Sequence, residues 1–192
     1  ATIEAKGYDW RPFTQRVAEV FELDEAGEIA TRRLYGMLRD IELDKAATAS
    51  MTDASGYKGG SASSTRTTIE KLLEIGSQGD IEAIKEQCNE KLTIIDGVYG
   101  VANGLEGVLG LLAARPRPVF GHERPTRILA GEHDALVEFA IDPARPRLAE
   151  WFRIVDGKVR VVESYWMLRE IGVNPMENYA QDRHRRQVIL PI

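Results

Sequence analysis

The sequence predicts an α+β fold, in which helices come first along the chain and strands follow them. Apolar residues recur at helical spacing in several segments before residue 112. From about residue 119 to residue 166, short apolar runs are separated by the turn sequences GEHD, DPARP and DGK. Helices followed by an antiparallel meander are typical of an α+β domain.

The composition indicates one globular domain with an extension. The chain has 192 residues, of which 43% are hydrophobic and 29% are charged, so it can bury a sizeable core. A net charge of −5 gives no electrostatic reason for binding nucleic acid, and we expect no nucleic-acid partner. Cys88 is the single cysteine, which excludes an internal disulfide and a thiolate metal cluster.

The sequence has no stretch long enough to span a bilayer and no leader pattern at its start. We therefore expect no membrane association and a cytoplasmic location.

Residues 1–65 are predicted to form a helical hairpin followed by a flexible linker. Pro12 suits a first helical turn, and Asp24 is placed to cap a second helix. The two helical stripes of residues 8–45 consist of Phe13, Val17, Val20 and Phe21, and of Ala30, Leu34, Met37, Leu38 and Ile41. Residues 46–66 are rich in Ser, Thr, Gly and Ala, as linkers are. The hairpin could act as a lid, a dimer interface or a docking element, and the sequence does not choose among these.

Three helices are predicted in the main domain, residues 66–170. Thr67 and Glu70 fit a capping box for the first, and Asp80 can cap the second, which carries Ile81, Ile84 and Cys88. The third extends from Leu105 to Leu112. The predicted strands are the run LTII before the turn Asp96–Gly97, and then 119–120, 127–130, 134–141, 147–155 and 158–166. Residues 171–192 form a tail.

Several segments resemble one known superfamily. The segment LLEIGSQGDIEAIKEQ is similar to two helices joined by a Gly-Asp turn, and the segment GVANGLEGVLGLL is similar to a third helix entered through glycine. The segment EWFRIVDGKVRVVESYW is similar to a pair of final strands. The elements that these segments resemble belong to the nuclear transport factor 2, ketosteroid isomerase and SnoaL superfamily. The resemblance covers about the central hundred residues. It implies a cone-shaped, curved antiparallel sheet wrapped around three helices, with an apolar pocket at one end. This scaffold hosts isomerases, dehydratases, cyclases, epoxide hydrolases and non-catalytic binders.

Glu150 is the first candidate catalytic residue. Strand alternation puts Glu150 and Phe152 on one face and Arg153 on the other, and the apolar set is expected to face the pocket. Burial raises the pKa of a carboxyl, so Glu150 would stay protonated and donate a hydrogen bond to an enolate. The resemblance places it where ketosteroid isomerases carry the acid of their oxyanion hole.

Asp96 is the second candidate. The resemblance places it at the catalytic base, which would move a proton between carbons beside a carbonyl. The alternative is that Asp96 only stabilises its Asp-Gly turn by bonding its own backbone.

The remaining pocket candidates complete the predicted site. Val162, Ser164 and Trp166 share one face of the last strand, with Trp166 as an aromatic floor or simply a core residue. Tyr99 could replace the oxyanion-hole tyrosine that the first helix lacks, and His122 could stand at the pocket mouth. Ser164 stands where limonene-epoxide hydrolases, which the last strand also resembles, need an aspartate.

No phosphate-binding glycine loop or metal-ligand spacing is present in the sequence, and no cofactor or metal is expected. We therefore expect a SnoaL-like enzyme that acts on a hydrophobic carbonyl or polyketide-like compound by proton transfer, as an isomerase, cyclase or dehydratase. A hydrophobic small molecule and a second copy in a homodimer are the expected partners. The alternative is a non-catalytic ligand-binding or assembly module of the same fold.

Overall fold

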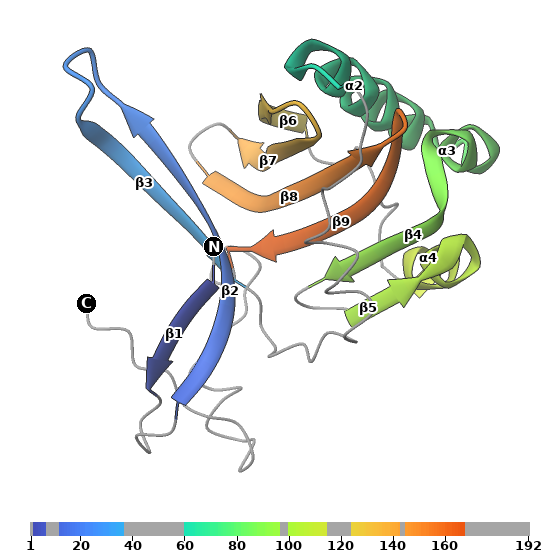
Figure 1. Cartoon of the computed structure of the whole chain (residues 1–192), viewed down its shortest axis with the longest axis horizontal. Helices are drawn as coiled ribbons and strands as arrows, with labels where there is room; N and C mark the ends of the chain where they lie inside the picture. The colour runs from blue at the N-terminus through green and yellow to red at the C-terminus, as the bar shows by residue number, and fades with distance from the viewer. Residues whose placement is uncertain are drawn as a thin grey trace.

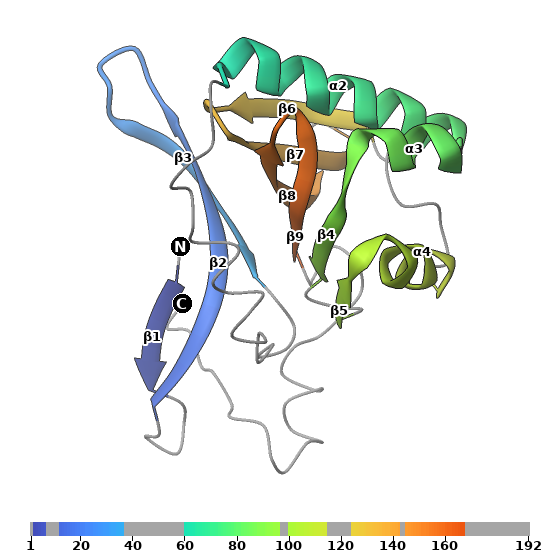
Figure 2. The ribbon, with the colours of Figure 1, turned by 45° about the vertical axis from the view of Figure 1, so that its right-hand side comes forward.

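A computed structural model describes residues 2–6, 12–36, 60–96, 100–114, 124–142 and 145–167. Three helices, α2 (Ala62–Gln78), α3 (Ile81–Gln87) and α4 (Gly104–Ala114), lie beside one curved sheet (Figures 1 and 2). None of these helices has the length and apolar character that crossing a bilayer requires.

The first helix begins earlier than the sequence predicted. Ser61 and Ser64 form a reciprocal cap, in which the Ser61 side chain accepts from the Ser64 amide and the Ser64 side chain accepts from the Ser61 amide. The prediction of a capping box at Thr67 is therefore wrong, and residues 62–66 are helical although they were assigned to the linker. Asp80 caps α3 as predicted, because its carboxylate accepts from the Ala83 amide at 3.0 Å.

The strands of the main domain follow the predicted meander. They are β4 (Cys88–Asp96), β5 (Gly100–Asn103), β6 (Arg124–Ala130), β7 (Asp134–Asp142), β8 (Arg145–Val155) and β9 (Lys158–Trp166). Strands β6 to β9 pair antiparallel in chain order, β4 pairs parallel with β9, and β5 pairs antiparallel with β4. The strand predicted at residues 119–120 lies outside the described residues.

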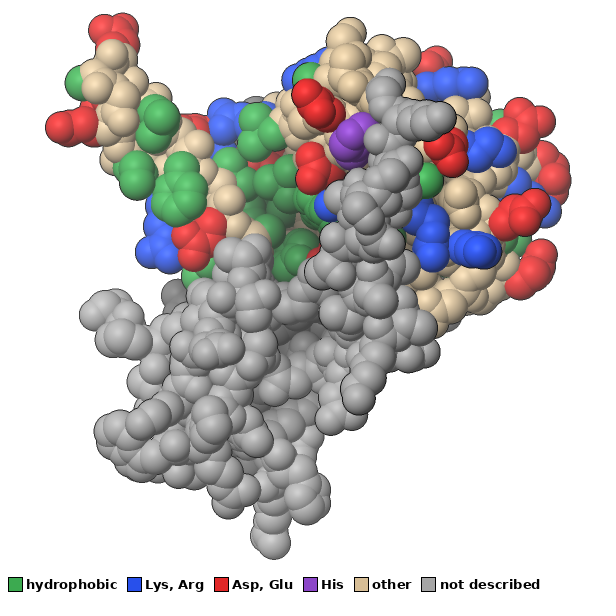
Figure 3. Space-filling model, in the orientation of Figure 1, with side chains coloured by type: hydrophobic (Ala, Val, Ile, Leu, Met, Phe, Trp, Pro, Cys, Tyr) green, Lys and Arg blue, Asp and Glu red, His purple; other side chains and the backbone are tan. Residues whose placement is uncertain are grey.

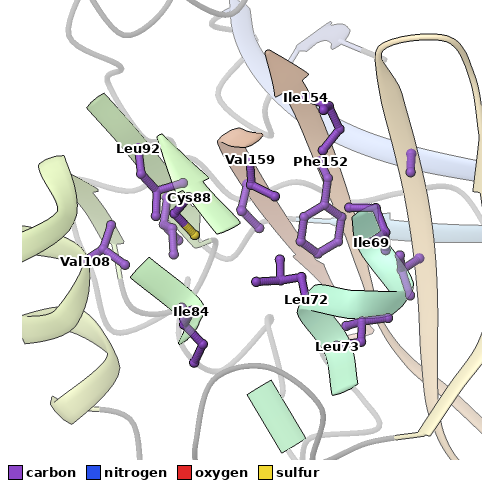
Figure 4. Packing of buried hydrophobic residues seen from close by; sticks show 14 of the residues in the cluster. Ile69, Leu72, Leu73, Ile84, Cys88, Leu92, Val108, Phe152, Ile154 and Val159 are labelled. Carbon is purple, nitrogen blue, oxygen red and sulfur yellow. The ribbon is translucent and has the colours of Figure 1, made fainter. Parts of the chain in front are cut away.

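The inner face of the curved sheet packs on the three helices. Figure 4 shows Ile69 and Leu72 of α2 close to Phe152 of β8, and both Leu72 and Phe152 are fully buried. Burying such side chains removes water from apolar surface, which is the main source of the domain's stability. The α+β class and the three helices beside a curved sheet are thus confirmed.

The predicted helical hairpin is wrong. Residues 12–23 and 29–36 form strands β2 (Pro12–Leu23) and β3 (Ile29–Gly36), and β1 (Thr2–Lys6) pairs with β2. Between β2 and β3, Asp24 accepts amide hydrogen bonds across a tight turn and Gly27 takes a φ of 81°. Residues 37–45 of the prediction lie outside the described residues.

Tertiary packing explains why the segment forms strands. Ala18, Val20 and Tyr35 lie on one face of the hairpin, against Ile95 and Val161 on the outer face of the main sheet. Short apolar runs adopt the conformation in which they find a partner surface, and a pleated surface suits β-branched and aromatic residues. Since this contact is on the outer face, residues 18–36 do not cover the inner face as a lid.

A buried ion pair fastens the hairpin to the sheet. The Arg33 guanidinium of β3 donates to both carboxylate oxygens of Glu138 of β7, at 2.7 and 2.9 Å. The Tyr35 hydroxyl donates to the same carboxylate at 2.6 Å. Arg33 also pairs with Glu22 at 2.9 Å, and that contact lowers the pKa of Glu22. The N-terminal strands are therefore joined to the main domain by both apolar and ionic contacts.

Candidate active site

Three polar residues form a single row across the inner face of the sheet. Asp96 of β4 is the register partner of Ser164 in β9, and Ser164 is the register partner of Glu150 in β8. Register partners point to the same side of a sheet, so all three side chains share one face. Phe152, Val162 and Ile94 form the neighbouring row of that face. The sheet thus brings together the two carboxyls that the sequence singled out.

The row is buried and hydrogen-bonded. Asp96 and Ser164 are completely inaccessible to water, and Glu150 is 2% exposed. The Ser164 hydroxyl donates to Glu150 Oε1 at 3.0 Å, and the Trp166 indole donates from Nε1 to Asp96 Oδ1 at 3.1 Å. Each carboxyl therefore has one oxygen fixed by a neutral donor from β9.

The local structure explains the burial of Asp96. It is the last residue of β4, where the chain runs parallel to β9 and antiparallel to β5. Its side chain points into the inner face, as does that of Ile94 two residues earlier. A role confined to an exposed Asp-Gly turn does not fit a carboxyl with no water-accessible surface.

The other predicted pocket residues fall into two groups. Phe152 and Val162 are buried on the inner face as predicted, and Trp166 is partly buried beside them. Tyr99 and His122 lie outside the described residues, so their places at the site stay predictions.

Comparisons with known proteins find similar solved structures at low sequence identity. No protein-family model matches the sequence, and no curated protein matches it. Similar solved structures include an NTF-2 like protein of unknown function from Burkholderia xenovorans LB400, with 18% identity, a TM-score of 0.45 and coverage of 54% of this chain and 83% of that chain. Another is an LEH-like epoxide hydrolase from M. tuberculosis, with 16% identity, a TM-score of 0.47 and coverage of 58% of this chain and 88% of that chain.

A third similar structure is a candidate ketosteroid isomerase from Kribbella flavida DSM 17836, with 18% identity, a TM-score of 0.46 and coverage of 56% of this chain and 80% of that chain. Likeness at this level concerns the fold alone. The chain's own element order and strand pairing match the architecture that its sequence resemblance implies. The chain has a nuclear transport factor 2-like fold.

One contact of the candidate site was missed by sequence reasoning. Trp166 was expected to be an aromatic floor of the pocket or simply a core residue, whereas its indole nitrogen also bonds Asp96. The available signal was that an indole N–H seeks an acceptor when buried. The identity of that acceptor depends on the pairing of β4 with β9, which the sequence does not reveal.

A metal centre finds no support in the described part of this fold. No group of three His, Cys, Asp or Glu side chains among those residues is placed to hold a metal ion. A surface depression of about 500 Å³ lies at the opposite end of β4 from Asp96, and it is lined by Asn89, Glu90, Lys91, Val155, Lys158 and Arg160. Four of its six lining residues are charged, whereas the inner face of the sheet is mostly apolar.

Proposed function

We propose that this protein is a cofactor-independent enzyme that moves a proton on a hydrophobic carbonyl compound, as an isomerase, cyclase or dehydratase does. The observation that supports it is the row Asp96, Ser164 and Glu150, which places two carboxyls on either side of Ser164 on one apolar, water-excluding face. Two carboxyls in different environments can act as a base and an acid on one substrate.

Asp96 is the proposed base. The indole N–H of Trp166 can donate a hydrogen bond but cannot accept one. Asp96 Oδ1 must therefore act as the acceptor in this bond. The fixed ring also holds the carboxyl in one orientation, and correct orientation is a large part of catalytic rate.

Glu150 is the proposed acid or hydrogen-bond donor to the developing enolate. Oε1 accepts from the Ser164 hydroxyl, so a proton on Glu150 would be carried by Oε2. A neutral carboxylic acid in an apolar wall stabilises an oxyanion by donating to it. The neighbouring Phe152 and Val162 favour an uncharged, hydrophobic substrate.

The same hydrogen bonds support a second candidate function. Buried polar groups are normally satisfied inside the protein, and the row from Asp96 to Glu150 is consistent with a network that only stabilises the sheet. In that case the domain is a non-catalytic binding or assembly module. A substrate must also displace whatever covers these buried side chains, whereas a structural network needs no such opening.

Hydrogen exchange at carbon separates the two functions without knowledge of the true substrate. A panel of hydrophobic ketones is incubated with the protein in D₂O, and deuterium at the position beside the carbonyl is measured by NMR. The proposal predicts protein-dependent exchange with at least one ketone and a loss of about 100-fold or more in Asp96→Asn. No exchange with any ketone would favour the binding module.

Glu163→Gln provides the matched control. Glu163 is 1% exposed and adjacent to Ser164, but it lies on the outer face, where the Tyr165 hydroxyl donates to it. This variant should retain exchange, because only the inner face is proposed to hold the ketone. Equal losses in Asp96→Asn and Glu163→Gln would show that the effect comes from disturbed folding, and would remove the support for Asp96.

The homodimer is also a proposal. Light scattering of the 192-residue chain tests it directly. A single species with the mass of one chain would contradict it.

A further inference from the structure

The β2–β3 hairpin presents an uncovered apolar strip on its outward face. The strip consists of Phe21, Leu23 and Ile29, whose side chains are 46%, 63% and 62% exposed. Leu23 and Ile29 are register partners, and Phe21 lies two residues before Leu23 on the same face. Exposed apolar groups of this size that adjoin one another mark a surface with a binding partner.

This strip is distinct from the surface that joins the hairpin to the sheet. Ala18 and Val20 alternate with the strip residues along β2, and they are buried against the outer face of the main sheet. The strip is therefore the second face of the hairpin, and the described contacts leave it open.

Acidic residues border the strip at the hairpin tip. Asp24, Glu25 and Glu28 are exposed, and Figure 3 shows acidic side chains at the tip beyond the apolar ones. Among the described residues Glu25 and Glu28 form no ion pair, while Glu19 farther along the hairpin is already paired with Arg32 at 2.9 Å. The tip thus carries three negative charges next to an apolar strip.

The chain itself contains a segment with the complementary pattern. Residues 183–192 read RHRRQVILPI, in which three arginines precede the apolar run Val188, Ile189 and Leu190. We propose that residues 183–192 bind the hairpin of the same chain, with the apolar run on the strip and the arginines beside the acidic tip. Three positive charges then face three negative ones, and an apolar run faces an apolar strip.

The length of the connection permits this contact. Gly36 at the base of β3 is the register partner of Trp166, so the described chain ends near the hairpin base. The seven residue steps from Gly36 to Ile29 span about 23 Å at the rise of a strand. The 16 steps from residue 167 to residue 183 can span about 50 Å when extended, which is more than enough.

A second hairpin is a poorer occupant for the same surface. Two strips that met face to face would each bring Asp24, Glu25 and Glu28 into the contact, and like charges in an interface oppose association. The arginine-containing segment removes that charge instead of doubling it.

Charge reversal in the full chain tests the proposal. Hydrogen exchange of the amides in residues 20–31 is measured by mass spectrometry for the tail variant Arg183→Glu/Arg185→Glu/Arg186→Glu, for the tip variant Glu25→Arg/Glu28→Arg, and for the variant that combines them. Asp24 is left unchanged because its carboxylate accepts the amide hydrogen bonds of the turn. The tail variant and the tip variant should each exchange about tenfold faster than the unmodified chain, and the combined variant should recover most of the protection. Glu74→Arg/Glu86→Arg/Glu90→Arg, which changes three exposed acids elsewhere, should exchange as the unmodified chain does.

Three outcomes would overturn the proposal. The first is that exchange of residues 20–31 changes in neither the tail variant nor the tip variant. The second is that the combined variant exchanges as fast as the tail variant and the tip variant do, because charge complementarity would then have no part in the effect. The third is that protection disappears on dilution, which would assign the contact to a second copy of the chain and not to the same chain.

Discussion

The ion pair between Arg33 and Glu138 is expected to contribute much of the stability of the contact between the N-terminal hairpin and the main sheet. The side chain of Glu138 is 3% exposed and that of Arg33 is 16% exposed, so both charges have left bulk water. Removing one partner of such a pair leaves a buried charge uncompensated, at a cost of about 3 to 5 kcal/mol. In Arg33→Met the Tyr35 hydroxyl still donates to Glu138, and Arg127 lies 3.9 Å away.

Because these contacts remain, the free energy of unfolding should fall by about 3 kcal/mol, the lower end of that range. This is more than a 100-fold change in the unfolding equilibrium. Urea unfolding followed by circular dichroism measures it. Arg32→Met is the matched control, because Arg32 is the neighbouring residue and its side chain is 56% exposed in its pair with Glu19. Its unfolding midpoint should equal that of the unmodified chain, because exposed pairs contribute little.

A double variant separates the ion pair from simple loss of packing. In Arg33→Met/Glu138→Leu no uncompensated charge is left, so part of the lost stability should return. The reasoning is refuted if Arg33→Met is as mild as Arg32→Met, or if the double variant is less stable than Arg33→Met alone.

Three further predictions concern single sites. A Cβ at Gly60 would lie 2.0 Å from a backbone carbonyl oxygen, so Gly60→Ala should lower the free energy of unfolding by about 1 to 3 kcal/mol. A Cβ at Gly107 on α4 would meet open space, so Gly107→Ala should raise the free energy of unfolding by about 0.4 to 1 kcal/mol. Urea unfolding midpoints measure both changes. Burial raises the pKa of Cys88 from its ordinary 9.0 to about 11. The buried neutral thiol therefore stabilises the fold fully below pH 9 and loses that contribution as the pH rises to 11, so the urea midpoint should fall more steeply over this range in the unmodified chain than in Cys88→Ala. Trp166→Phe replaces the indole by a smaller aromatic ring that lacks the N–H donor to Asp96, and should lower the free energy of unfolding by about 1 to 3 kcal/mol; an unchanged urea midpoint would show that the bond contributes nothing.

Local sequence signals predicted the main domain because its helix caps and turns contain the residues that these conformations favour. Asp80 caps a helix, the DGK turn joins β8 to β9, and Gly157 takes the positive φ of 73° that this turn needs. The first helix was placed too late because Ser61 and Ser64 give a cap as good as the one expected at Thr67. Both signals are present in the sequence, and only the contacts of Thr65 with the turn before β7 show which one begins the helix.

The N-terminal segment was assigned to the wrong structure for a different reason. Val17, Val20 and Phe21 fit helical spacing, but Ala18 and Val20 also fit one face of a strand. What decides between them is the outer face of the main sheet, a surface made of residues far along the chain, such as Ile95 and Glu138, the second of which is 105 positions from Arg33. A pattern within one segment contains no information about such a partner.

The candidate site depends on one irregularity in β4 that strand alternation alone does not reveal. Cys88 is paired with Val159, and a regular parallel ladder would then bring Asp96 opposite residue 167, beyond the last strand. The register shifts between Cys88 and Thr93, so Asp96 instead lies opposite Ser164. This shift of three residues aligns Asp96 with the row of Glu150. Since side chains alternate along a strand, a shift of two or four residues would pair Asp96 with an outer-face neighbour and separate the two carboxyls. Alternation along each strand predicts which face each carboxyl occupies. The register shift in β4 then places the two carboxyls in one row. The proposed chemistry requires both the shared face and the shared row.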